Sequence, residues 1–111
     1  MKVQNKINIL GTEYEILVQK ANENPKLKDA YGLCEYYSKK IVLSEIEDNV
    51  NNFEKIEEFK KKVLRHEIIH AFFAESGLQG NCDYAECEEL VDWIAIQIPK
   101  LAKIFEELDI L

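Results

Sequence analysis

The segment that most constrains the fold is Arg65–Ala71, which holds both histidines of the chain, His66 and His70. On an α-helix a step of four residues turns the chain by about 400°, so the two imidazoles lie about 40° apart around the axis and about 6 Å along it. Glu67 lies three residues before His70 and therefore borders the same face. Apolar residues around this segment recur with a helical period from Phe53, and Gly77 suits a helix C-terminus. We therefore predict a long amphipathic helix from Phe53 to Ser76.

The two histidines with the intervening glutamate form an HExxH pattern, which on a helix is typical of a zinc site. The alternative is that both histidines are ordinary helix residues. Buried imidazoles on an apolar helix would then need other polar partners. Neutral imidazole is a zinc ligand, and one helical turn sets two imidazoles to bind one ion. We predict that His66 and His70 bind a metal.

The residues before this helix are expected to form a small antiparallel sheet. Two pairs of short β-branched and aromatic runs are separated by Gly11-Thr12 and by Ser38-Lys39, which indicates two hairpins. The four predicted strands are Ile7–Leu10, Tyr14–Val18, Gly32–Tyr37 and Lys40–Leu43. A polar loop with Pro25, for which a short helical turn is the alternative, joins the hairpins, and Ser44–Asn52 connects them to the helix. The sequence predicts an α+β fold in one domain, residues 1–111.

A second helix is predicted after a turn over Gly77–Asp83. It runs from about Tyr84 to Ile98, is interrupted by Pro99, and is followed by a short helix from Leu101 to Leu108. Its buried side is expected to comprise Leu90, Val91, Ile94, Ala95 and Ile98. Large aromatic side chains are expected in the core. These are Phe53, Phe59, Phe72, Phe73, Trp93 and Phe105.

A catalytic zinc ion usually has three protein ligands and one water, so a third ligand must come from outside the HExxH pattern. The candidates are acids and thiols of the second helix and the turn before it: Cys82, Asp83, Glu86, Cys87, Glu88, Glu89 and Asp92. Glu88 and Asp92 are four residues apart, so both can face the site, whereas Glu89 shares a face with Trp93. The spacing slightly favours Glu88, with Glu86 and Glu89 as alternatives.

His66-Glu67-Ile68-Ile69-His70 followed by Glu88-Glu89-Leu90-Val91-Asp92 resembles the gluzincin pattern. It is also similar to the small ImmA/IrrE-like and phage-encoded minimal zinc peptidases, over roughly Gly32 to Pro99. The resemblance implies a zincin-like domain in which a sheet packs on the HExxH helix and a glutamate-bearing helix. It also implies that His66, His70 and Glu88 are zinc ligands, Glu67 is the catalytic base, and Asp92 orients a histidine. Because no further histidine is present, Tyr84 is the candidate stabiliser of the oxyanion.

The function expected from these parts is zinc-dependent hydrolysis of a peptide bond by a metal-activated water, with Glu67 as general base. A protein or peptide substrate is expected to dock in extended form along an edge strand, for which Ile41-Val42-Leu43 is the candidate. The alternative is a metal-binding regulatory or interaction module with a peptidase-like fold and little or no proteolysis.

Charge and composition exclude several other classes of function. The chain has 21 acidic and 14 basic residues and a formal net charge of −7, which argues against nucleic acid or an anionic membrane as the main partner. No apolar run is long enough to span a bilayer, and the first residues lack the apolar region of a signal peptide. Three cysteines, Cys34, Cys82 and Cys87, indicate no disulfide scaffold. We expect a cytoplasmic protein with unliganded cysteines.

Overall fold

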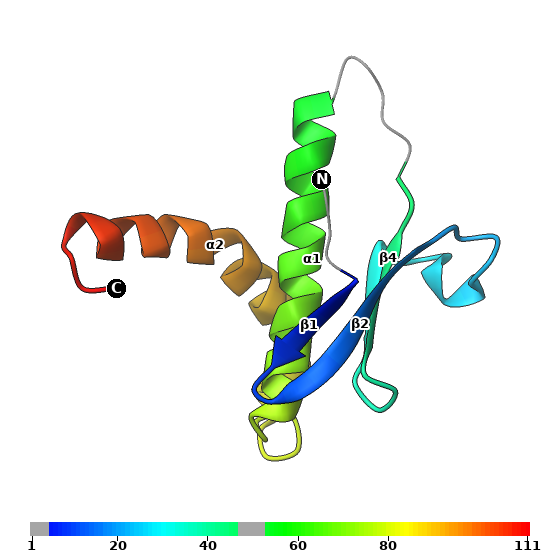
Figure 1. Ribbon diagram of the computed structural model, residues 1–111, viewed down its shortest axis with the longest axis horizontal. Coiled ribbons are helices and arrows are strands. Elements are labelled where there is room, and N and C mark those ends of the chain that lie inside the picture. The colour runs from blue at the N-terminus through cyan, green and yellow to red at the C-terminus, as the bar shows by residue number, and fades with distance from the viewer. Residues whose placement is uncertain (1–4, 47–52) are drawn as a thin grey trace.

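The computed structural model describes residues 5–46 and 53–111, which form a four-stranded mixed sheet and two long helices (Figure 1). The α+β architecture agrees with the prediction. The strands are β1 (Lys6–Ile9), β2 (Thr12–Gln19), β3 (Gly32–Glu35) and β4 (Lys40–Ser44). The helices are α1 (Phe53–Glu75) and α2 (Glu88–Glu107), with short 3₁₀ turns η1 (Pro25–Leu27) and η3 (Asp83–Glu86).

The sheet has the strand order β1-β2-β4-β3, and one of its three pairings differs from the prediction. Both hairpins are present, since β1 pairs antiparallel with β2 and β3 pairs antiparallel with β4. The hairpins join through β2 and β4, however, and these two strands are parallel, with Ile16 opposite Ile41. The prediction of a wholly antiparallel sheet was therefore wrong.

The position of β4 follows from its side chains. Ile41, Val42 and Leu43 are all nearly inaccessible to solvent, so the strand is covered on both faces, as parallel strands usually are. β4 lies between β2 and β3 in the sheet, whereas β3 is only half-buried and has β4 as its one neighbour among the described strands. The prediction that Ile41-Val42-Leu43 lies at a sheet edge was wrong, and β3 is the edge strand on that side.

Helix α1 covers one face of the sheet and contributes to the main core. The core cluster comprises Ile9, Tyr14, Ile16, Ile41, Leu43, Val63 and Ala71. The helix ends as predicted: Gly77 follows with φ +86, a left-handed conformation that glycine adopts without steric cost. The predicted connector is described only up to residue 46; the rest, 47–52, lies outside the described residues.

Helix α2 is longer and more continuous than predicted. It begins at Glu88 rather than near Tyr84, which instead lies in η3, and it continues through Pro99 to Glu107. Pro99 has no N–H, so the carbonyl of Ala95 loses its helical partner. The Nε–H of Arg65 on α1 donates to that carbonyl at 2.7 Å. The predicted interruption at Pro99 was wrong because another helix supplies the missing donor.

Burial along α2 also differs from the prediction. Val91 and Ala95 are fully buried and pack with Ile69 of α1, with Ile94 partly buried beside them. Leu90, Trp93 and Ile98 are exposed, as is Phe72 on α1. The core assignment of Phe72 and Trp93 was wrong, since no described element covers them; the side chain of Phe53 lies outside the described residues.

Neither helix, over its described residues, combines the length and the apolar content needed to cross a membrane.

Candidate metal centre

The two histidines converge near the point where α1 meets the first turn of α2. Their Nε2 atoms are 3.2 Å apart. His66, Glu67 and His70 each offer a ligand atom, and these atoms lie within 4.8 Å of one another. Two nitrogens bound at about 2.0–2.1 Å to one tetrahedral ion would stand about 3.3 Å apart. This His/Glu/His group can therefore hold a metal ion.

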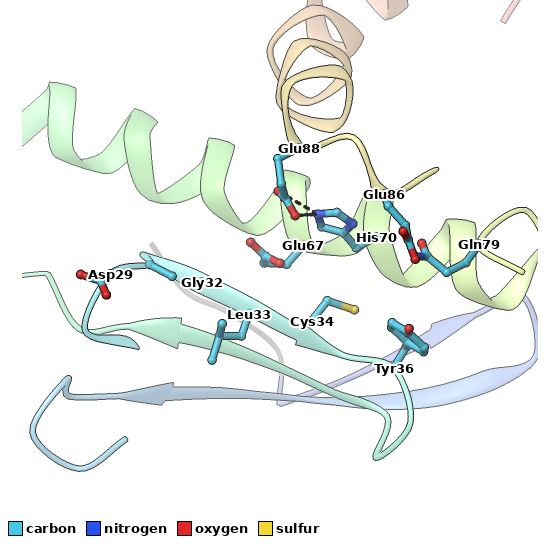
Figure 2. A pocket seen from close by; sticks show the side chains of 11 residues that line it. Asp29, Gly32, Leu33, Cys34, Tyr36, Glu67, His70, Gln79, Glu86 and Glu88 are labelled. Atoms are coloured by element: carbon cyan, nitrogen blue, oxygen red, sulfur yellow. Dashed lines mark hydrogen bonds and ion pairs between the residues drawn. The ribbon is translucent and has the colours of Figure 1, made fainter. Parts of the chain in front are cut away.

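Glu88, the first residue of α2, meets both imidazoles. Its Oε2 lies 2.7 Å from Nε2 of His66. Its Oε1 lies 3.0 Å from Nε2 of His70 (Figure 2). Burial raises the pKa of Glu88, but hydrogen bonds to His70 and His66 outweigh it and leave the pKa below its ordinary value. The carboxylate is therefore ionised at neutral pH, as a metal ligand must be.

Asp92 lies one helical turn after Glu88 and contacts the far side of the His66 ring. Its Oδ1 is 3.1 Å from Nδ1 of His66 and 3.1 Å from Nζ of Lys62. Burial raises the pKa of Asp92, and the hydrogen bonds from Lys62 and His66 more than reverse this, so Asp92 is also ionised. An ionised carboxylate at Nδ1 favours the tautomer in which that nitrogen carries the proton.

This tautomer has a consequence for the centre. The hydrogen bond between Nε2 of His66 and Glu88 requires a proton on that nitrogen. When neutral His66 instead holds its one proton on Nδ1 and donates to Asp92, its Nε2 carries a lone pair and cannot donate to Glu88. That lone pair then faces a carboxylate oxygen at 2.7 Å and the second imidazole at 3.2 Å. Electron-rich atoms so close together repel one another unless a proton or a cation stands between them. The donor arrangement thus fits a metal ion.

Glu67 lies on the side of α1 that faces the sheet. Its side chain lies between α1 and β3 (Figure 2) and is 7% exposed. Burial raises the pKa of Glu67 to about 7, with His66 opposing the shift. Gly32 on β3 makes this approach possible: a Cβ there would lie 2.9 Å from Cγ1 of Val63 and 3.0 Å from Cγ of Glu67.

A cavity of about 530 Å³ opens beside the histidines, between α1 and β3. The helices contribute Glu67, His70 and Glu88 to its lining. The opposite wall comprises Leu33 and Cys34 of β3 and Tyr36 just after this strand (Figure 2). Burial raises the pKa of Cys34 to about 12, so its thiol is neutral and is a poor metal ligand in this state. The cavity thus places a strand backbone alongside the metal-binding residues.

The remaining candidates from the sequence lie further from the histidines. Glu86 lines the same cavity, but its carboxylate accepts a hydrogen bond from Nε2 of Gln79 at 3.2 Å. A smaller cavity of about 290 Å³ lies on the His66 side, and Glu89, which is exposed, borders neither this cavity nor the larger one. Tyr84, 74% exposed, lines neither cavity, whereas Tyr36 lines the larger one. Sequence reasoning missed Tyr36 and Gly32, because only the packing of β3 on α1 brings them to the site.

A second polar cluster lies at the C-terminal end of α1. Oε2 of Glu75 accepts from the hydroxyl of Tyr14 at 2.7 Å and from Nζ of Lys39 at 2.8 Å. Hydrogen bonds from Lys39, Tyr14 and Thr12 lower the pKa of Glu75 to about 2. This cluster joins α1 to β2 and to the turn between β3 and β4.

Comparison of the chain with protein families, with curated proteins and with solved structures found no match.

Proposed function

We propose that the protein is a zinc-dependent metallopeptidase with a zincin-like domain. The observation that carries the proposal is the convergence of two imidazole nitrogens and the Glu88 carboxylate within 2.7–3.2 Å of one another. Two histidines and one glutamate are a common ligand set for catalytic zinc, which keeps its fourth position for water. In this proposal His66, His70 and Glu88 hold the metal, and Asp92 orients His66.

Bound zinc would supply a water of lowered pKa and polarise the scissile carbonyl. Glu67 follows His66 directly in the chain, and it borders the cavity beside His70. Its role is to accept a proton from the attacking water and to deliver it to the nitrogen of the leaving amine. The hydroxyl of Tyr36 is the donor that borders the cavity, and it replaces Tyr84 as our candidate for stabilising the oxyanion.

The substrate is proposed to be an extended peptide that lies along β3. This strand pairs with β4 on one side only. Its residues Leu33 and Cys34, together with Tyr36 in the turn that follows, line the cavity beside Glu67. An edge strand can pair with an extended segment through main-chain hydrogen bonds. Such a peptide would pass between β3 and the metal ligands, with a peptide bond within reach of Glu67.

The second candidate is a metal-binding regulatory or interaction module without efficient proteolysis. Two features favour it: Tyr84 lies away from the cavity, and Glu88 is 69% exposed, so the centre is shallow. In this case zinc binding would stabilise the fold without turnover of any peptide.

The test is cleavage of a peptide library by zinc-loaded protein, by chelated protein and by zinc-loaded Glu67→Gln. We expect cleavage by the loaded wild type, none after chelation, and a rate lower by about 10²- to 10⁴-fold in Glu67→Gln. Elemental analysis should show that Glu67→Gln keeps its zinc. A variant that retains zinc and cleaves at the wild-type rate would refute the role of Glu67, and zinc-loaded wild type without any cleavage would favour the regulatory module.

A further inference from the structure

The C-terminal part of α2 carries an apolar face that nothing in the described chain covers. Beyond its first turns the helix extends away from α1 and the sheet (Figure 1). Nine of the sixteen exposed large apolar side chains of the described residues lie between Leu90 and Leu111. Leu101, Ile104 and Leu108 are 47%, 51% and 64% exposed. Contiguous exposed apolar surface of this kind marks an interaction site.

The spacing of this face is that of a helix that packs on another helix. Ile94, Gln97, Leu101, Ile104 and Leu108 follow one another at steps of three and four residues, the a and d positions of a heptad repeat. A groove of about 370 Å³ runs along these positions, with Trp93 and Lys100 on one side. Pro99 falls at an f position, on the opposite side of the helix. The repeat thus continues past the proline.

The margins of the face indicate what covers it. One margin carries Lys100 and Glu107, both at g positions and one heptad apart; the other carries Ile98 and Phe105, both at e positions. In a parallel pair of these helices g would face e′, and charged groups would face apolar ones. In an antiparallel pair g faces g′ and e faces e′. Lys100 then lies opposite Glu107 of a second copy, and Ile98 opposite Phe105.

Two-fold symmetry makes each of these contacts occur twice. When Leu101 packs beside Ile104 of the second copy, Gln97 lies beside Leu108 of the second copy. The two Lys100–Glu107 pairs flank these contacts along the helix pair. The surface is therefore complementary to itself in charge, and its central apolar positions meet apolar positions of the second copy. Helix α2 begins at Glu88, so antiparallel packing leaves the two metal centres at opposite ends of the helix pair.

We propose that the chain forms a homodimer through antiparallel packing of α2, residues 93–108. The occupant of the face is a second copy of this chain. The proposal is independent of the peptidase function, because none of its contacts involves His66, His70 or Glu88.

The sharpest test uses charge variants of the full chain in sedimentation velocity. Lys100→Glu alone places two glutamates opposite each other, and Glu107→Lys alone places two lysines opposite each other. We expect each to weaken the wild-type dimer by on the order of 10-fold. An equimolar mixture of the two variants should restore dimers, as should the double variant, because every g–g′ pair is again attractive. Lys103→Glu, at the outward c position, is the matched control and should leave the dimer unchanged.

A second variant tests the apolar contact. Leu101→Asp should make the chain monomeric while the far-ultraviolet circular dichroism keeps its helical signal. If this variant loses its helical signal, its oligomeric state does not test the contact. The charge variants then decide whether the dimer forms as proposed, because they alter only exposed side chains. A monomeric wild type, or a mixture of Lys100→Glu and Glu107→Lys that dimerises no better than either variant alone, would overturn the proposal and assign the face to a different partner.

Discussion

Helix α1 carries two clusters of polar side chains that differ in their charge balance. In the anchor cluster, Glu75 meets Lys39 and Tyr14, so one carboxylate is neutralised by one ammonium group. In the metal centre, His66 and His70 face Glu88, and Lys62 contacts Asp92 behind the His66 ring. The anchor cluster is complete as it stands, whereas the metal centre fits a cation at its middle.

The two clusters on α1 are therefore suited to different roles: one stabilises the fold, and the other is suited to bind a cation. The anchor cluster holds its groups by fixed hydrogen bonds between α1 and the sheet, so its loss should be seen in stability. The metal centre gathers lone pairs that repel one another without a cation, so its loss should be seen in metal binding.

The largest expected effect is on zinc affinity, which should depend on the metal centre and not on the anchor cluster. Glu88→Ala should lower the affinity for zinc by about 100-fold or more, because it removes one of the three proposed ligands. Glu89→Ala, which changes a neighbouring exposed carboxylate, is the control and should bind zinc as the wild type does. Isothermal titration of metal-free protein measures both. If Glu89→Ala or Glu86→Ala loses zinc while Glu88→Ala keeps it, the third ligand is misassigned.

The second effect is on folding. Glu75→Gln should lower the free energy of unfolding by about 1.5–3 kcal/mol, because it removes charge-assisted hydrogen bonds to Lys39 and Tyr14. Its zinc affinity should remain that of the wild type. Urea denaturation of the metal-free protein measures the first quantity. A Glu75→Gln variant as stable as the wild type would remove the distinction between the clusters.

The third effect concerns the contact between β3 and Glu67. Gly32→Ala should cost about 1–2 kcal/mol, because the added methyl group would overlap Val63 and displace Glu67. The rate of peptide cleavage should fall together with stability. Gly80→Ala is the matched control, since a Cβ there meets nothing within 4 Å. Equal stability of the two variants in thermal denaturation would contradict the close approach of β3 to α1.

The smallest effect is the pH dependence of stability. The pKa of Glu75 is lowered in the folded state to about 2 from an ordinary value of 4.5. Its stabilising contribution is therefore complete above pH 4.5 and is lost as pH falls toward 2. Between pH 4.5 and 3.5 the wild type should lose about 1 kcal/mol more than Glu75→Gln does. Urea denaturation at several pH values checks this, and parallel curves for the two proteins would disprove it.

The sequence predicted the parts of the centre that depend on local spacing. His66, Glu67 and His70 share a face because they lie within one turn of a helix, and Glu88 and Asp92 share a face for the same reason. The assignment of Glu88 as third ligand remains a prediction, although its carboxylate lies beside both imidazoles.

Features that depend on distant partners were not predicted. The continuation of α2 through Pro99 requires the Nε–H of Arg65, thirty-four residues earlier in the chain. The exposure of Trp93 depends on which elements extend far enough to cover it. The central place of β4 was signalled by the unbroken apolar run Ile41-Val42-Leu43, which lacks the alternation of an edge strand.

The bond from Arg65 to the carbonyl of Ala95 has a consequence for protein engineering. Arg65 directly precedes the first histidine, and Ala95 lies on the helix that begins at Glu88. Because Pro99 has no N–H, the carbonyl of Ala95 is free to accept from Arg65, and this hydrogen bond fixes the position of α2 relative to α1. A designer who transplants this centre to another scaffold should therefore move Arg65, Ala95 and Pro99 together with the histidines and Glu88.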